Sequence, residues 1–277
     1  MARSLALHQI TAMEAAPADL VSIASDVGCQ QVCIFTHIPI SALPDQHIRA
    51  AFPVVTRPMG RKMLERLRDR CISVGNIEFF PVTADAPIES YREGLALGSE
   101  LGAQRAVTHV HDPSDARAVE TLGRLADVAA EYGLSLGLEF MGLTPACNSV
   151  GRAVWFVTQV ARPNLGIGVD ALHLVRTGGT PADLAALPAH YFNYAQICDG
   201  HGLHLSADYL PEALDRMMPG DGDFPLKAMI EALPQAVALD VEVPSVKLAD
   251  AGIPAVDRAR EAVARARALI DSAIVSR

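Results

Sequence analysis

The stretch Glu131-Tyr-Gly133-Leu-Ser-Leu-Gly-Leu-Glu139-Phe140 contains the unit that repeats along this chain. A helical pattern ends at Gly133, because glycine accepts the left-handed conformation that a turn into the next strand needs. An apolar strand follows at once and ends in a carboxylate. The same order of helix end, glycine and strand occurs at Asp26-Val-Gly28 and at Glu100-Leu-Gly102. Repeats of this kind predict parallel βαβ units.

Eight runs of apolar or β-branched residues are predicted as strands: Leu5–Gln9, Gln31–Thr36, Asn76–Val82, Arg105–His111, Leu134–Phe140, Leu165–Asp170, Tyr191–Asp199 and Val237–Val243. Helical spacing lies between them, as in Leu122, Leu125, Ala126 and Ala129. Eight such units predict one α/β domain over residues 1–277, a single (β/α)₈ TIM barrel, and the length suits that fold. An open doubly wound sheet is the alternative, but no glycine-rich dinucleotide fingerprint follows the first strand.

Composition narrows the function classes. A formal net charge of -9 argues against a phosphate-backbone binder, so no nucleic-acid partner is expected. The five cysteines are scattered without a CxxC pair and are predicted to be buried, reduced thiols. Because no run is apolar and long enough for a signal peptide or a membrane span, we expect a cytoplasmic protein with no membrane partner.

Polar residues fall at the carboxyl ends of four successive predicted strands, which is where such barrels carry their active sites. The residues are Glu139, Asp170, Gln196 and Glu242. Oxygen donors that converge in this way suit a hard divalent cation, so Mn²⁺ or Mg²⁺ is predicted, with Zn²⁺ or Co²⁺ as alternatives. A single acidic residue at a strand end is more often a helix N-cap or a solvated loop residue, but four polar residues that each end an apolar strand are hard to explain in that way. Asp240 shares a strand face with Glu242, which lies nearer the carboxyl end and is preferred.

At these residues the chain resembles the xylose-isomerase-like superfamily of sugar isomerases and epimerases. The resemblance rests on five short motifs in the family's order: Leu138-Glu139, Val169-Asp170-Ala-Leu-His173, Gln196-Ile-Cys-Asp199, Pro219-Gly-Asp-Gly-Asp-Phe-Pro225 and Val241-Glu242-Val. They cover the second half of the chain. The ketose 3-epimerase branch commonly has Glu, Asp, His and Glu as metal ligands, so Gln196 departs from that pattern.

The resemblance also implies roles for individual residues. Glu139 and Glu242 correspond to the branch's acid/base pair, and His173 corresponds to a histidine that contacts a substrate oxygen. The metal would polarise a carbonyl and an adjacent hydroxyl and would stabilise the enediolate that forms on loss of a carbon-bound proton. Dimers or tetramers are common among such proteins, so a homo-oligomer is also suggested.

Further candidates for substrate contact come from other strand ends and from one loop. His109 and His111 end the fourth predicted strand, and His8 ends the first. Each is equally consistent with a histidine that makes only a local hydrogen bond. Asp199 ends the seventh strand. Arg216, which precedes the Gly-Asp-Gly loop, is a candidate clamp for a carboxylate or phosphate.

The leading interpretation is a metal-dependent isomerase or epimerase of a small sugar, ketose or cyclitol. A lyase that dehydrates a keto-cyclitol of the inosose or dehydroshikimate type would use the same site. A nuclease that resembles the apurinic endonucleases is a third reading, which the acidic charge and Gln196 disfavour. A non-enzymatic binding module is the fourth.

Overall fold

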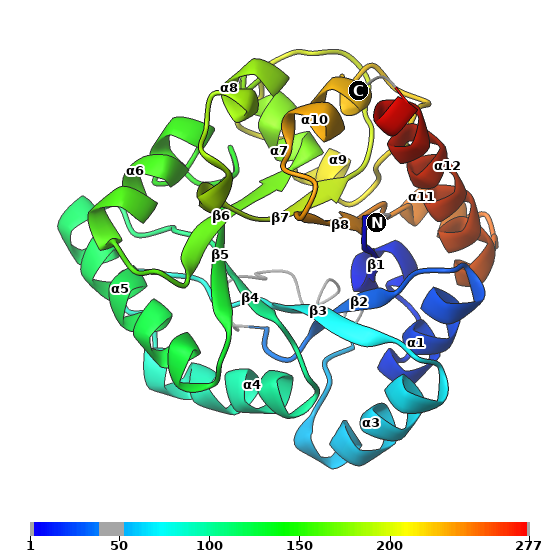
Figure 1. Cartoon of the computed structure of the whole chain (residues 1–277), viewed down its shortest axis with the longest axis horizontal. Coiled ribbons are helices and arrows are strands. Elements are labelled where there is room, and N and C mark those ends of the chain that lie inside the picture. The colour runs from blue at the N-terminus through cyan, green and yellow to red at the C-terminus, as the bar shows by residue number, and fades with distance from the viewer. Residues whose placement is uncertain (1–2, 39–52, 276–277) are drawn as a thin grey trace.

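Eight parallel strands close into a barrel in the computed structural model, which describes residues 3–38 and 53–275 (Figure 1). Each strand pairs with its neighbours in sequence, and β1 pairs with β8 to complete the ring. The predicted (β/α)₈ fold is therefore confirmed. The strands are β1 (Leu5–His8), β2 (Gln31–Phe35), β3 (Ser73–Glu78), β4 (Arg105–Thr108), β5 (Ser135–Glu139), β6 (Leu165–Asp170), β7 (Phe192–Ile197) and β8 (Ala238–Val241).

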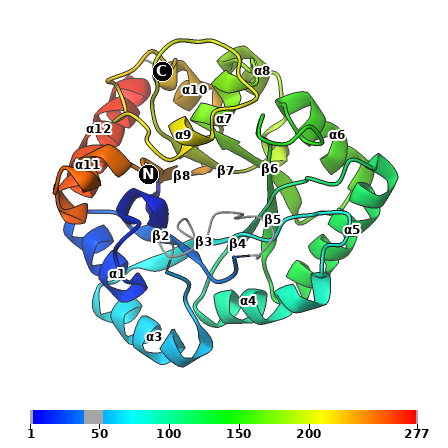
Figure 2. The same cartoon turned by 180° about the vertical axis from the view of Figure 1, so that it is seen from behind.

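Helices surround the barrel on all sides, as the opposite view also shows (Figure 2). The longer ones are α1 (Pro17–Asp26), α3 (Gly60–Asp69), α4 (Ile88–Glu100), α5 (Asp115–Glu131), α6 (Val150–Val160), α10 (Leu226–Ala232) and α12 (Ala255–Val275). The shorter ones are η1 (Gln9–Ala12), η2 (Arg57–Met59), α7 (Ala171–Arg176), α8 (Pro181–Ala185), η3 (Ala189–Tyr191), α9 (Leu210–Ala213) and α11 (Val246–Asp250). α12 packs beside α1, so the first and the last long helices are neighbours in the helical ring.

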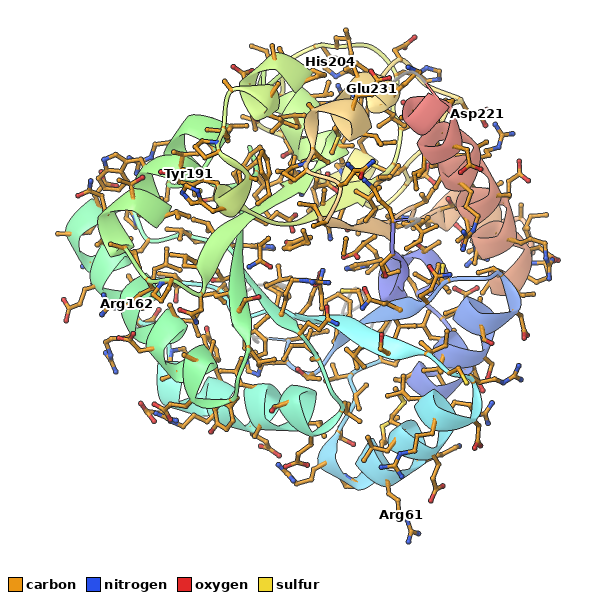
Figure 3. The ribbon with its side chains drawn as sticks, viewed as in Figure 1. Arg61, Arg162, Tyr191, His204, Asp221 and Glu231 are labelled. Carbon is orange, nitrogen blue, oxygen red and sulfur yellow. The ribbon has the colours of Figure 1, made fainter. Side chains whose placement is uncertain are left out.

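The glycines and the apolar helix face that the sequence indicated have the predicted local conformation and burial. Gly28, Gly102 and Gly133 have φ values of 84°, 80° and 71°, so each adopts the left-handed conformation that was predicted after a helix. The predicted face of α5 is fully buried against the barrel. Charged side chains such as Arg61 and Arg162 point outward from the helical ring (Figure 3).

Most strand boundaries differ from the prediction by one to a few residues, and the differences at β3, β4 and β8 bear on the site. β3 begins at Ser73, three residues before the expected Asn76, because Ser73 and Val74 pair with Gln31 and Val32 of β2. β4 stops at Thr108, so His109 and His111 follow the strand instead of ending it. β8 likewise ends at Val241, one residue before Glu242.

The cysteine prediction is confirmed in part. All five thiols are free, and four are buried, but Cys71 is exposed. It lies directly after α3, where its φ of 53° turns the chain toward β3. Among the helices of the described residues, none combines the length and hydropathy that a bilayer span requires.

Candidate active site

Glu139, Asp170, Gln196 and Glu242 lie at one end of the barrel, on four consecutive strands. Glu139 and Asp170 are the last residues of β5 and β6, Gln196 pairs with Asp170 across β6 and β7, and Glu242 directly follows β8. All four are buried. Alternation turns their side chains to the barrel interior, on the same face as Tyr194 and Asp240.

Arg216 lies between two of these carboxylates. Its Nη1 donates to Asp170 Oδ2 at 2.6 Å, and its Nη2 donates to Glu242 Oε1 at 3.1 Å. The guanidinium is almost completely buried, and its Nε donates to the carbonyl of Ala213. The sequence predicts that Arg216 is a clamp for a carboxylate or phosphate of the substrate. The structure instead gives it two anions of the protein itself as partners.

Burial raises the pKa values of Asp170 and Glu242, and Arg216 lowers them. Burial raises the pKa of Asp170, but Arg216 and His173 outweigh it and hold that pKa below its usual value. Burial dominates at Glu242 and raises its pKa to about 8, although Arg216 opposes it. Asp170 Oδ1 also caps α7 by accepting the His173 N–H at 3.0 Å, so the helix-cap interpretation is correct for this residue as well.

Glu139 accepts a hydrogen bond from Tyr194 and lies close to His173. The Tyr194 hydroxyl donates to Glu139 Oε2 at 2.6 Å, and His173 Nε2 lies 3.3 Å from Glu139 Oε1. Tyr194 fits inside the barrel only because β5 and β6 carry glycine beside it. A Cβ on Gly137 or Gly168 would lie 2.5 or 2.4 Å from the tyrosine ring.

His109 and His111 lie beyond the end of β4. His109 stacks on Phe79 with ring centroids 5.2 Å apart, and its Nε2 is 3.9 Å from Glu139 Oε2. Burial is the main cause that lowers the pKa of His109 well below its usual value, and it lowers the pKa of His111 too. Both rings are therefore neutral imidazoles at physiological pH. The structure brings His109 beside Glu139, with His111 6.1 Å further on between ring centroids.

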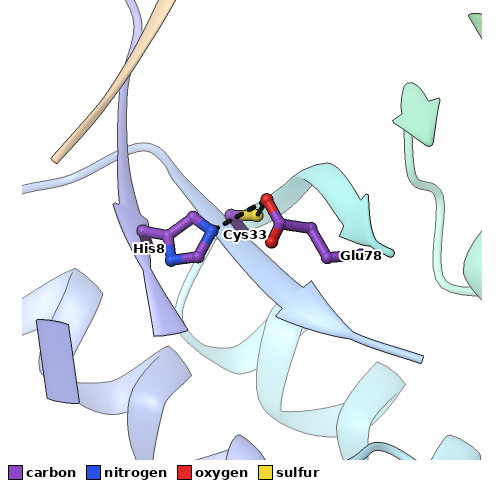
Figure 4. A group of neighbouring side chains, drawn as sticks. All are labelled: His8, Cys33 and Glu78. Atoms are coloured by element: carbon purple, nitrogen blue, oxygen red, sulfur yellow. Dashed lines mark hydrogen bonds and ion pairs between the residues drawn. The ribbon is translucent and has the colours of Figure 1, made fainter. Parts of the chain in front are cut away.

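His8 joins Cys33 and Glu78 in a buried cluster on β1, β2 and β3 (Figure 4). His8 Nε2 lies 2.8 Å from Glu78 Oε1, and the Cys33 thiol donates to the same oxygen at 3.3 Å. Burial lowers the pKa of His8, but Glu78, Glu242 and Asp240 outweigh it and raise the pKa to about 10. The Ile10 N–H donates to His8 Nδ1, which opposes a second proton on the ring.

Two sets of residues offer donor atoms to a metal ion. Among the described residues, the donor atoms of His8, Cys33 and Glu78 lie within 4.8 Å of one another, and no trio of the predicted carboxylates meets that spacing. However, His8 Nε2 carries a proton toward Glu78 both in the charged ring that its raised pKa favours and in the neutral ring that the Ile10 N–H on Nδ1 favours, and this proton opposes coordination through that atom. This cluster is therefore a hydrogen-bonded trio.

The predicted ligands fit a cation through two unsatisfied oxygens. Gln196 Oε1 and Glu242 Oε2 are buried and have no hydrogen-bond partner. Buried oxygens of this kind are costly unless a donor or a cation meets them. Both are hard donors, as a divalent ion such as Mg²⁺ or Mn²⁺ prefers. To bind an ion through all four ligands, the carboxylates would have to move closer together and exchange Arg216 for the metal.

A polar network crosses the barrel beneath this site and was not anticipated. Asn76 Nδ2 donates to Asp240 Oδ2 at 2.5 Å, and Arg105 Nε donates to Asn76 Oδ1 at 2.6 Å. Burial raises the pKa of Asp240 to about 6. Asp240 thus binds a residue of the opposite wall, while Glu242 one layer above lies at the mouth.

Asp199 holds a loop together. Its Oδ1 accepts the N–H groups of Gly200 and Phe224, and its Oδ2 accepts that of Gly220 at 2.8 Å. The Gly-Asp-Gly segment is therefore tied to the end of β7. A direct contact between Asp199 and substrate stays a prediction, because these contacts neither require it nor test it.

Sequence reasoning missed Tyr194, Glu78 and Tyr209. Tyr194 and Glu78 each follow the alternation of interior positions on a strand, two residues from Gln196 and Asn76 respectively, so the signal was present. Tyr209 comes from the loop between β7 and α9, and its contact with His173 has no sequence signal.

Comparison with known proteins identifies the family. Residues 24–269 match the model of the xylose isomerase-like TIM barrel. The chain belongs to this family. The resemblance drawn from the sequence is thereby confirmed.

More specific relatives are similar over part of their length. The inosose isomerase of Bacillus subtilis is 30% identical over 125 residues, which cover 44% of this chain and 44% of that protein. The 3-dehydroshikimate dehydratase of Pseudomonas aeruginosa is 30% identical over 112 residues, 40% of this chain and 17% of that protein. The matched part thus spans less than half the length of these curated relatives.

Solved structures show the same fold over nearly the whole chain. The IolI protein with a bound zinc atom superposes with a TM-score of 0.79 at 19% identity and covers 97% of this chain and 98% of its own. L-ribulose 3-epimerase superposes with a TM-score of 0.73 at 16% identity and covers 100% and 97%. At these identities the likeness establishes the fold alone.

Proposed function

We propose that this protein is a divalent-metal-dependent isomerase or epimerase of a small polyhydroxylated sugar, ketose or cyclitol. Glu139 and Glu242 are its acid/base pair. The observation that carries the proposal is the different environment of these two glutamates at one barrel mouth. The Tyr194 hydroxyl donates to Glu139 Oε2 at 2.6 Å and His173 Nε2 lies 3.3 Å from Glu139 Oε1, whereas Glu242 has one buried oxygen without a partner. The similarity of this protein to an inosose isomerase and to a ketose epimerase supports the reaction class.

The two glutamates then divide the proton transfers. The Tyr194 hydroxyl fixes the position of the Glu139 carboxylate, so Glu139 is suited to take the proton from the carbon beside a carbonyl. Glu242, on the far side of β6 and β7, returns a proton. Return to the other face of the same carbon gives epimerisation, and return to the neighbouring carbon gives isomerisation.

Glu139, Asp170, Gln196 and Glu242 would hold the metal. A bound Mn²⁺ or Mg²⁺ would polarise the substrate carbonyl and stabilise the negative charge that develops as the proton leaves. Zn²⁺ and Co²⁺ remain alternatives, and the zinc atom of the structurally similar IolI protein supports a divalent ion. We assign His173, His109 and His111 to substrate oxygens, and Arg216 and His8 to the charge balance around them.

A dehydratase is the second candidate. It begins with the same proton abstraction but ends with loss of a β-hydroxyl, which needs a proton donor. Glu242, which returns the proton in the isomerisation, can supply that proton, and one relative is a 3-dehydroshikimate dehydratase. An enone product absorbs in the ultraviolet, so its appearance would favour this reaction over isomerisation.

The first test is metal content, measured on the wild type and on Glu139→Gln/Glu242→Gln. We expect a stoichiometric ion in the wild type and its loss in the variant. Glu65→Gln/Glu89→Gln is the matched control, because both of its side chains are more than half exposed and lie outside the barrel. Absence of bound metal after incubation with Mn²⁺ would overturn the metal-dependent mechanism.

The second test is hydrogen exchange. Ketoses and inososes are incubated with the metal-loaded protein in deuterated water. The protein's substrate should then take up deuterium at the carbon next to its carbonyl. The double glutamate variant should not promote this uptake, whereas the control variant should. Absence of exchange across the panel would contradict the enolisation step that both candidate reactions share.

A further inference from the structure

His173 lies between Glu139 and Tyr209, and its ring forms a hydrogen bond with Tyr209. Its Nε2 lies 3.3 Å from Glu139 Oε1, and its Nδ1 lies 2.8 Å from the Tyr209 hydroxyl. The ring is buried. A neutral imidazole carries its hydrogen on one nitrogen only, so the position of that hydrogen decides what His173 can do.

A third group fixes the direction of the hydrogen bond between Tyr209 and His173. The Gly142 N–H donates to the Tyr209 oxygen at 2.8 Å. The hydroxyl has one hydrogen, and among the described residues its only acceptor partner is His173 Nδ1. If the hydroxyl accepted a hydrogen from Nδ1 as well, its own hydrogen would be buried without an acceptor, which is costly. Burial also raises the pKa of Tyr209 above its usual value, so the hydroxyl keeps its proton.

We infer that Tyr209 is a positioning residue that locks His173 with its hydrogen on Nε2, directed at Glu139 and the barrel mouth. His173 is then a hydrogen-bond donor at Nε2 and cannot coordinate a metal through that atom. The use of this donor in catalysis rests on the proposed function, but the position of the hydrogen does not.

Arg176 and Gly142 each support the contact between Tyr209 and His173. Arg176, at the end of the helix that carries His173, donates to the backbone carbonyls of His201 and Gly202 and pairs with Glu212. It thereby anchors the loop that carries Tyr209 to the helix of His173. Gly142 permits the close approach, because a Cβ there would lie 3.0 Å from the Tyr209 ring and 2.9 Å from a loop carbonyl.

Nitrogen NMR of protein labelled with ¹⁵N in its histidines tests the inference without substrate or metal. Long-range ¹H–¹⁵N correlations show which ring nitrogen carries the hydrogen, and a His173→Gln sample assigns the signal. At an alkaline pH where the ring is neutral, we expect the hydrogen on Nε2 in the wild type. We expect the same in Glu139→Gln, because Tyr209 maintains it.

Two variants without the Tyr209 hydroxyl should change the ¹⁵N resonances of the His173 ring. In Tyr209→Phe, the Nδ1 resonance should move to the position of an unprotonated nitrogen without a hydrogen bond. In Glu139→Gln/Tyr209→Phe, both tautomers should appear. Tyr91→Phe is the control, because it removes a buried tyrosine hydroxyl that donates to Pro81 instead. A hydrogen on Nδ1 in the wild type, or a tautomer mixture in Glu139→Gln alone, would overturn the inference and leave the proposed function standing.

Discussion

Replacement of Arg216 by methionine tests how the charges of the site are balanced. Methionine keeps the apolar stem but removes the guanidinium that binds Asp170 at 2.6 Å and Glu242 at 3.1 Å. Both carboxylates would remain buried without a cation. Breaking a buried ion pair by deleting one partner costs about 3–5 kcal/mol. For a domain of this size the melting temperature should fall by roughly 6–20 °C.

The loss of unfolding free energy in Arg216→Met should be larger at high pH than at low pH. Arg216 holds the pKa of Asp170 down, so this ion pair stabilises the fold above the unfolded pKa of the carboxyl and less as pH falls through the folded pKa. The gap in unfolding free energy between wild type and Arg216→Met should therefore be wide at pH 8 and should narrow only below the unfolded pKa of the carboxyl, about 3.9.

A divalent ion should rescue this variant. In the wild type the guanidinium competes with the ion for Asp170 and Glu242, whereas in Arg216→Met the ion is their only cation. Differential scanning fluorimetry with Mn²⁺ or with a chelator should show a larger ion-induced shift in the variant. Arg258→Met is the control, because Arg258 is equally buried but pairs with Glu14 at the surface. Equal ion-induced shifts in wild type and Arg216→Met, or a melting temperature unchanged by the mutation, would refute the reasoning.

Three other substitutions test separate features. Gly168→Ala would place a Cβ 2.4 Å from the Tyr194 ring, break its bond to Glu139 and cost about 1–3 kcal/mol in denaturant unfolding. Asp240→Asn removes a carboxyl whose raised pKa, about 6, makes the wild type less stable as pH rises from 4 to 7, so unfolding of the variant should vary less over that range. Asp199→Ala frees three loop N–H groups, and limited proteolysis should then cut residues 219–224 faster; an unchanged cutting rate would contradict the loop role.

Local signals in the sequence were enough for the barrel. The apolar strand runs, the helical faces and the glycines with positive φ each act within a few residues, and all agree on the same βαβ repeat. The convergence of Glu139, Asp170 and Gln196 follows as well, because the strands of a parallel barrel bring their carboxyl ends to one rim. The start of β3 was misplaced because pairing with β2 sets that boundary, and pairing partners are distant in sequence.

The partners of these residues were decided by tertiary structure alone. Arg216 reaches Asp170 across 46 positions in the sequence, Tyr194 reaches Glu139 across 55, and Tyr209 reaches His173 across 36. Such contacts depend on side-chain direction and on loop paths, for which periodicity carries no information. The sequence by itself determined which oxygens gather at the barrel mouth. Only the folded chain determines which cation and which hydrogen bond each of them meets, because those partners come from loops and from opposite walls of the barrel.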